Sequence, residues 1–316
     1  MRAFLLRLAR FGALAAFAAL TSFALNRALF RFHVPPWEEP VRTLVLGDSN
    51  VESSPDPGGL PAAVSLAKGA EPLVVTYHKL RAFVGRIESG GAVVLGINPH
   101  NVGRSVDLQM AHPPTREEFF ARYYGLVPWL EIEGVDVVGG PLLVATARAW
   151  AVPNPHLAGD AIAWLSGGPR EHDYAFGYRS EDLPKALLPQ ALESVTRSHF
   201  PPGLDPAWSD LQIDHARRIA DLTSEAGLTL VLYSAPLHPR YVERIPPAVL
   251  ERFDRLVSGL AGRPDVVRLD LMEAPWPEDL FRDFNHVTVA GSRLTTRRLA
   301  EVLCALPGHA EEPPCR

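Results

Sequence analysis

Short, mostly apolar stretches alternate with amphipathic segments through most of the chain. The stretches with the length of strands are residues 43–46, 63–66, 92–95, 228–233 and 266–269. In longer segments, apolar residues recur at steps of three and four, as on the buried face of a helix: residues 71–88, 209–225, 249–260 and 289–304. Strands that alternate with helices predict an α/β fold with a mainly parallel central sheet, arranged as a three-layer sandwich.

The N-terminal segment has a different pattern. A basic start precedes a charge-free apolar run at residues 11–25, as in a secretory signal or a short membrane anchor. The run is shorter than the ~20 residues that span a bilayer, but residues 28–30 extend it if Arg27 snorkels to the interface. Because no small-x-small cleavage site follows, we predict that residues 1–32 form an uncleaved single-pass anchor. A cleaved signal or a buried amphipathic helix is the alternative.

The remaining chain divides by composition. Residues 33–41 are rich in proline and predict a stiff linker, residues 42–306 carry the α/β pattern, and residues 307–316 form a tail. The pattern is interrupted at about 102–208 by a segment rich in proline and tryptophan, which we interpret as an insertion or lid packed on the sheet, with helices near 115–124 and 141–150. Its tryptophans either stack on a sugar or acyl group or fill a core.

Charge and cysteine content narrow the function classes. The net charge is -5 and there is no basic tract, so nucleic acid is not expected as a partner. Cys304 and Cys315 are the only cysteines; they either pair, as an exported chain allows, or remain unrelated thiols. There is no metal-ligand motif and no glycine-rich phosphate loop, and we predict neither a metal nor another cofactor.

Candidate catalytic residues follow two of the predicted strands. The strand at 43–46 runs into Gly47-Asp48-Ser49, which delivers a serine to the carboxyl edge where open α/β sheets bind ligands. Asp283 and His286 follow the last predicted strand and precede the last helix, at the same edge. A carboxylate three residues before a histidine can bond Nδ1–H and leave Nε2 to face a serine hydroxyl. Asp48 is expected to order its turn through backbone hydrogen bonds.

These motifs, in this order, resemble the SGNH (GDSL-type) hydrolases, whose fold is flavodoxin-like. The resemblance implies that Ser49 is the nucleophile, His286 the base and Asp283 its orienting carboxylate. It also implies an oxyanion hole that includes the N–H of Gly69 and the side chain of Asn98 or Asn101. The chain departs from the family pattern in lacking the leucine after Gly-Asp-Ser and in having Pro99 after the Gly-x-Asn turn.

The resemblance implies a serine esterase or O-acyltransferase that acts on acyl esters. With an anchor and an insertion, the chain looks most like the membrane-tethered envelope branch, which handles acyl groups on polysaccharides; the body is then expected in the periplasm or outside the cell, beyond a bacterial inner membrane. Asn50 and His238 are candidate substrate contacts, although His238 lies in a stretch that also suits a structural loop. The alternative is a non-catalytic envelope protein that binds a glycan or a partner on the same fold.

Overall fold

The computed structural model describes residues 1–33, 41–111, 119, 122–123, 126–127, 155–166, 178, 187–205 and 207–315. The chain forms two compact units. The N-terminal unit comprises Met1–Pro36 and Met110–Ala175, and the sheet unit comprises Trp37–Gln109 and Phe176–Arg316. The candidate site lies entirely in the sheet unit.

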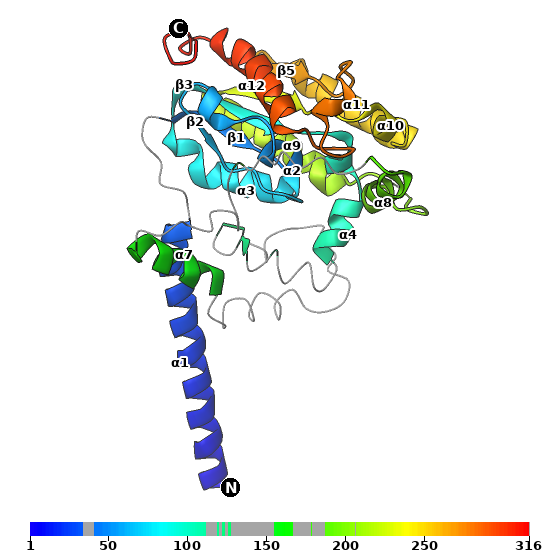
Figure 1. Cartoon of the computed structure of the whole chain (residues 1–316). Coiled ribbons are helices and arrows are strands. Elements are labelled where there is room, and N and C mark those ends of the chain that lie inside the picture. The colour runs from blue at the N-terminus through cyan, green and yellow to red at the C-terminus, as the bar shows by residue number, and fades with distance from the viewer. Residues whose placement is uncertain are drawn as a thin grey trace. The chain divides into compact units, whose positions relative to one another are not determined.

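The sheet unit is built on five parallel strands in the order β2-β1-β3-β4-β5. The strands are β1 (Val41–Leu46), β2 (Ala63–Ser65), β3 (Ile87–Gly96), β4 (Thr229–Ser234) and β5 (Val266–Asp270) (Figure 1). The predicted α/β class and parallel sheet are therefore confirmed. The order reverses between β1 and β3, so the carboxyl ends of these two strands border the crevice where such sheets bind ligands.

Helices connect the strands. After the N-terminal helix α1 (Arg2–His33), the described helices are α2 (Ser49–Glu52), α3 (Leu73–Phe83), α4 (Ser105–Ala111), α7 (Pro155–Ser166), α8 (Pro189–His199), α9 (Asp210–Glu225), α10 (Pro239–Val242), α11 (Pro247–Ala261) and α12 (Val289–Cys304). The helix expected over 71–88 ends at Phe83. Residues 87–91 join β3 instead, because glycines at 85, 90 and 91 weaken a helix and Gly90 adopts a positive φ of 75°.

Both faces of the sheet are buried. Val45, Val94 and Val231 are fully buried and cluster with Leu299 and Leu303 of α12. The neighbouring positions on the same strands point to the opposite face and are equally buried: Leu44, Val93 and Leu230. Among the other helices, α3 packs on α9 and α9 contacts α11. Continuous burial explains why these strands have apolar runs without alternation.

The two ends of the interrupting segment are neighbours in the structure. Gly103 and Trp208 form an antiparallel bridge, the N–H of Arg104 donates to the carbonyl of Ala207 at 2.8 Å, and the N–H of Ser209 donates to that of Val102 at 2.8 Å. The first and last residues of the segment at about 102–208 are thus joined within the sheet unit, between β3 and α9. The helix predicted near 141–150 and most of 115–124 lie outside the described residues, as do residues 34–40 of the predicted linker.

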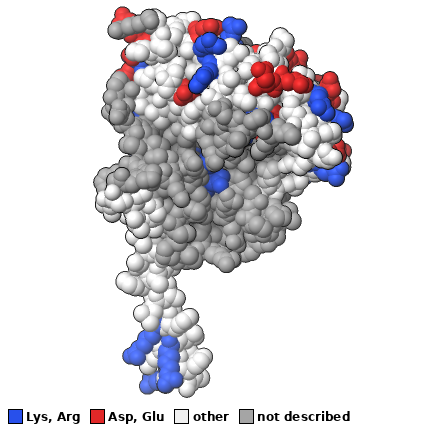
Figure 2. Space-filling view, in the orientation of Figure 1, with Lys and Arg blue, Asp and Glu red and all other residues white. Residues whose placement is uncertain are grey.

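The N-terminal unit contains one described helix that is long and apolar enough to cross a membrane, by length and composition, at Arg2–Leu29. Its 28 residues extend about 42 Å, more than the roughly 30 Å of a hydrocarbon core. Large apolar side chains along α1 are exposed, Phe11 and Phe17 among them. Basic side chains gather near its N-terminus, while the rest of its visible surface is uncharged (Figure 2). This supports the coarse expectation of an apolar N-terminal helix.

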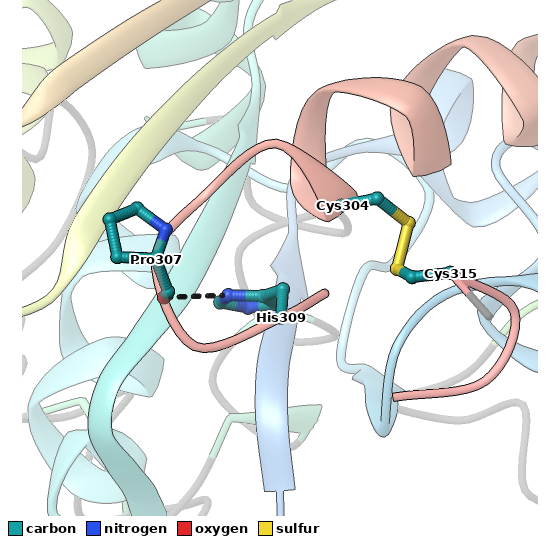
Figure 3. The surroundings of a disulfide bond; sticks show 4 residues. All are labelled: Cys304, Pro307, His309 and Cys315. Atoms are coloured by element: carbon teal, nitrogen blue, oxygen red, sulfur yellow. Dashed lines mark hydrogen bonds between the residues drawn. A yellow bond between two sulfur atoms is a disulfide. The ribbon is translucent and has the colours of Figure 1, made fainter. Parts of the chain in front are cut away.

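The sequence leaves open whether the two cysteines pair, and in the structure they do. Cys304, the last residue of α12, forms a disulfide with Cys315 (Figure 3). Within the enclosed loop His309 is fully buried, and Arg42 of β1 donates to the carbonyl of Gly308 at 2.8 Å. The tail is therefore fixed to the amino-terminal end of the sheet, away from the candidate site.

A pair of histidines between α3 and α9 makes stability depend on pH. Burial, together with the charges of His215 and two arginines, lowers the pKa of His78 to about 4 from 6.5. The unfolded chain therefore takes up a proton that the folded chain resists, so the stabilisation present above pH 6.5 is lost as the pH falls toward 4. Between about pH 7 and pH 5 we expect His78 to cost up to about 2 kcal/mol of unfolding free energy, with solvent screening of the ring reducing that amount.

The measurement is denaturant unfolding of the wild type and of His78→Gln at both pH values. The substitution removes the titrating group, so the loss of stability on acidification should be smaller in the variant by that amount. An identical loss in the two proteins would show that His78 titrates normally in the fold.

Candidate active site

Ser49 lies where β1 turns into α2. Gly47 adopts a φ of +146°, and a Cβ there would come within 2.7 Å of Val51 Cγ2, so the turn requires glycine. Asp48 caps the short helix and Ser49 is its first residue. Among the described residues, neither the N–H nor Oγ of Ser49 has a hydrogen-bond partner. Both groups are thus available to a ligand.

The side chain of Asp48 holds this turn to the end of β3. Its Oδ1 accepts from the N–H of Asn50 at 3.0 Å, and its Oδ2 lies 2.6 Å from Nε2 of His100 and accepts from Nδ2 of Asn101 at 2.9 Å. Burial favours the neutral acid, but the charge and hydrogen bond of His100, with the bonds from Asn101 and Asn50, lower the pKa of Asp48 to about 2. Asp48 is therefore an ionised anchor beneath Ser49.

Asp283 and His286 form a second acid–histidine pair in the loop between β5 and α12. Nδ1–H of His286 donates to Oδ1 of Asp283 at 2.8 Å, and the same oxygen accepts from the N–H groups of Asn285 and His286 at 3.1 and 2.9 Å. These bonds outweigh burial and lower the pKa of Asp283 to about 2. Nε2 of His286 has no hydrogen-bond partner among the described residues. The imidazole is thus oriented as a base with a free nitrogen.

Two contacts hold the chain after Ser49 against the helix that follows His286. The hydroxyls of Ser54 and Thr295 are hydrogen-bonded, and the N–H of Asp56 donates to Oγ1 of Thr296 at 2.9 Å. No hydrogen bond joins Oγ of Ser49 to Nε2 of His286. Catalytic hydrogen bonds are often long before a substrate binds, so the nucleophile–base contact stays a prediction.

Gly69 lies beside Ser49, but its N–H is already engaged. A Cβ on Gly69 would be 3.7 Å from Cβ of Ser49. Its N–H donates to Oε2 of Glu52 at 2.7 Å, and Nζ of Lys68 bonds Oε1 of the same carboxylate at 2.7 Å. Glu52 therefore occupies the group that was predicted to bind an oxyanion.

The two candidate asparagines are also used by the fold. Asn98 pairs with the backbone of Ala235 in both directions, donating at 3.1 Å and accepting at 2.9 Å. Asn101 accepts from the N–H of Asn98 at 2.7 Å and donates to Asp48. Each amide has a second N–H hydrogen that these bonds leave over. Asn98 joins β3 to β4, whereas Asn101 lies next to the Ser49 turn.

The candidate substrate contacts differ in environment. Asn50 is buried, and neither its Nδ2 nor its Oδ1 has a hydrogen-bond partner among the described residues. Such a buried amide is costly unless water or a ligand binds it, which fits a contact beside Ser49. His238 instead caps α10 by accepting from the N–H of Arg240, with the rings of Phe281 and Phe284 against it. That environment suits a structural loop.

Three further side chains lie at this edge that no sequence motif indicated: His100, His199 and Tyr241. His100 lies on the turn after β3, and a polar residue at the carboxyl end of a strand could have indicated a site residue. His199 ends α8 and its ring stacks on that of His100, with centroids 4.6 Å apart and planes at 14°. Nδ1 of His199 lies 2.5 Å from the hydroxyl of Tyr241. His199 lies in the segment read as an insertion, where no spacing pointed to it.

Burial and the neighbouring His100 lower the pKa of His199 to about 3, so the ring is neutral at ordinary pH. Burial also raises the pKa of the Tyr241 phenol, which stays protonated. The described residues contain no group of three histidine, cysteine, aspartate or glutamate side chains that could hold a metal ion. Comparison with protein-family models, curated proteins and solved structures finds no match to this chain.

Proposed function

We propose that the chain is a serine esterase or O-acyltransferase of the SGNH type, acting through an acyl-enzyme on a three-layer α/β sandwich. The observation that carries the proposal is the Asp283–His286 pair, with its 2.8 Å bond at Nδ1 and an unpartnered Nε2. The turn at Ser49 supports it, because this serine heads a helix at the carboxyl edge of the same sheet, and its N–H and Oγ have no hydrogen-bond partner among the described residues.

In the first step Oγ of Ser49 attacks the ester carbonyl while Nε2 of His286 takes the hydroxyl proton. The carbonyl oxygen becomes an oxyanion, and collapse expels the alcohol, which receives the proton from His286. Water or a second hydroxyl then attacks the acyl carbon while His286 takes its proton. The bond to Ser49 Oγ breaks, Oγ recovers the proton from His286, and the acid or the new ester leaves. Asp283 remains ionised and stabilises the imidazolium throughout. The N–H of Ser49, which has no partner among the described residues, is an oxyanion donor.

The proposed setting is the outer side of a bacterial inner membrane, with α1 as the anchor and an acylated envelope polysaccharide as substrate. The span at Arg2–Leu29 supports anchoring. The Cys304–Cys315 disulfide supports an oxidising compartment, because such bonds are rare in the cytosol. Acidic and basic side chains are interspersed on the visible described surface of the sheet unit (Figure 2), which fits a substrate other than nucleic acid.

The second candidate is a non-catalytic protein that binds a glycan or a partner at the same edge. It is favoured by the engaged N–H of Gly69 and by the missing hydrogen bond between Ser49 and His286. The two candidates differ in one property. Only the enzyme activates the Ser49 hydroxyl, so only the enzyme should react covalently with an electrophile that mimics an ester.

The test is labelling of the full chain in detergent with a fluorophosphonate. We expect the wild type to label and Ser49→Ala to lose all labelling, because the attacking oxygen is gone. Ser53→Ala is the matched control. It removes a serine hydroxyl at the residue that follows the same helix, and this hydroxyl bonds the backbone carbonyl of Ser49 rather than its Oγ, so labelling should be retained. An unlabelled wild type would favour the binding protein, and persistent labelling of Ser49→Ala would eliminate Ser49 as nucleophile.

A further inference from the structure

His199 contacts one of the two acid–histidine pairs of the site and is electrostatically coupled to the other. Its ring stacks on His100, which bonds Asp48 directly before Ser49. After burial, the groups that act most strongly on the pKa of His199 belong to these two pairs: His100, Asp48, His286 and Asp283. The backbone is fixed as well, because Oγ of Ser105 donates to the carbonyl of His199 at 2.5 Å. A residue of α8 is thus held at the edge of the sheet where Ser49 lies.

The partner of His199 determines which nitrogen carries the proton. The Tyr241 hydroxyl is buried, and Nδ1 of His199 is its only hydrogen-bond partner among the described residues. Because a buried hydroxyl proton needs an acceptor, Tyr241 donates to Nδ1. Nδ1 of a neutral ring then carries no hydrogen, and Nε2 must carry it. Nε2–H of His199 has no partner among the described residues, so it is a neutral donor available to a ligand.

We propose that His199 is a further catalytic residue, whose Nε2–H donates a hydrogen bond to the oxyanion that forms when Ser49 attacks. Tyr241 is a positioning residue that fixes the donor tautomer. The proposal accounts for two observations together. The fold engages the N–H of Gly69 and one N–H of each candidate asparagine, and an unassigned histidine donor stacks on His100, the partner of Asp48. A neutral imidazole suits the role, since it stabilises the oxyanion without surrendering its proton.

This inference rests on the proposed function, and labelling kinetics separate the two. The phosphoryl oxygen of a fluorophosphonate gains negative charge when Ser49 attacks, so its rate constant reports the same donors as an ester does. We expect His199→Ala to lower that rate constant about 10²-fold, as for loss of one oxyanion donor. His199→Gln keeps an N–H donor at a similar reach and should lose less than about tenfold.

His215→Ala is the matched control. It removes a buried histidine from the α3–α9 interface, whose ring bonds the carbonyl of Leu211, and it should label at the wild-type rate. A wild-type rate in His199→Ala, or equal losses in the alanine and glutamine variants, would overturn the donor role. Neither result would affect the proposed function as long as labelling still depends on Ser49.

Tyr241 is tested through its coupling to His199. Tyr241→Phe removes the group that enforces the tautomer and should slow labelling in the wild-type background. In the His199→Ala background it should have no further effect, because the group it positions is absent. Equal effects in both backgrounds would assign Tyr241 a structural role that is independent of His199.

Discussion

Asp283→Asn should lower the rate constant for fluorophosphonate labelling of Ser49 by about 10⁴-fold. The asparagine has nearly the same shape, but its neutral amide cannot stabilise the imidazolium that forms on His286. It also permits the opposite tautomer, in which Nδ1 accepts and Nε2 carries the hydrogen. Oδ1 of Asp283 accepts from two backbone N–H groups of its own loop, and the side-chain oxygen of asparagine can accept the same bonds. The substitution therefore tests charge and tautomer with little change in volume.

The matched control is Asp270→Asn at the end of β5, where the carboxylate bonds the N–H of Met272 and an arginine. It removes one carboxylate from the same edge of the sheet and should leave the labelling rate within about twofold of wild type. His286→Ala should lose at least as much as Asp283→Asn. A wild-type rate in either variant would contradict the assignment of this pair as the base.

Lys79→Met should lower the free energy of unfolding by about 3–5 kcal/mol, the largest stability effect that we expect. Lys79 and Glu71 form an ion pair whose side chains are both fully buried. Nζ of Lys79 also donates to the carbonyl of Leu66 at 2.6 Å, and Glu71 accepts from Thr76 at 2.9 Å. Methionine fills the same space, but the carboxylate of Glu71 then remains in the core without the ammonium.

The measurement is denaturant unfolding of the full chain in detergent. The double variant Glu71→Leu with Lys79→Met should recover much of the loss, because neither charge is then buried. Arg197→Ala removes an exposed pair with Glu193 and should cost less than about 1 kcal/mol. If Lys79→Met proved as stable as Arg197→Ala, the contacts of Lys79 with Leu66 and Glu71 would not contribute to the stability of the fold.

The sequence predicts the sheet well because burial on both faces leaves a simple signal. Val93, Val94 and Leu95 have no polar neighbour among them, since both sides of β3 are covered, and such a run is hard to mistake. The end of α3 was predicted less accurately. There, Gly85 and Gly90 compete with a helical apolar spacing, and the early start of β3 depends on pairing with β1, which a linear pattern does not contain.

The site was predictable only in part, for a related reason. Asp283 and His286 are three residues apart, so their hydrogen bond follows from local geometry. The engagement of Gly69 by Glu52 joins two segments, and the stack of His199 on His100 joins residues 99 apart in number. No periodicity encodes such contacts. The same holds for Lys79 and Glu71, which look like solvated charges on a helix until the core around them is known.

The central claim is that Ser49 is a nucleophile, and peptide mapping of the fluorophosphonate-treated full chain tests it most directly. The account predicts a single adduct, on the peptide that contains Ser49, with fragment ions that place the added mass on that residue. An adduct on a different residue, or no adduct under conditions that label known serine hydrolases, would contradict it.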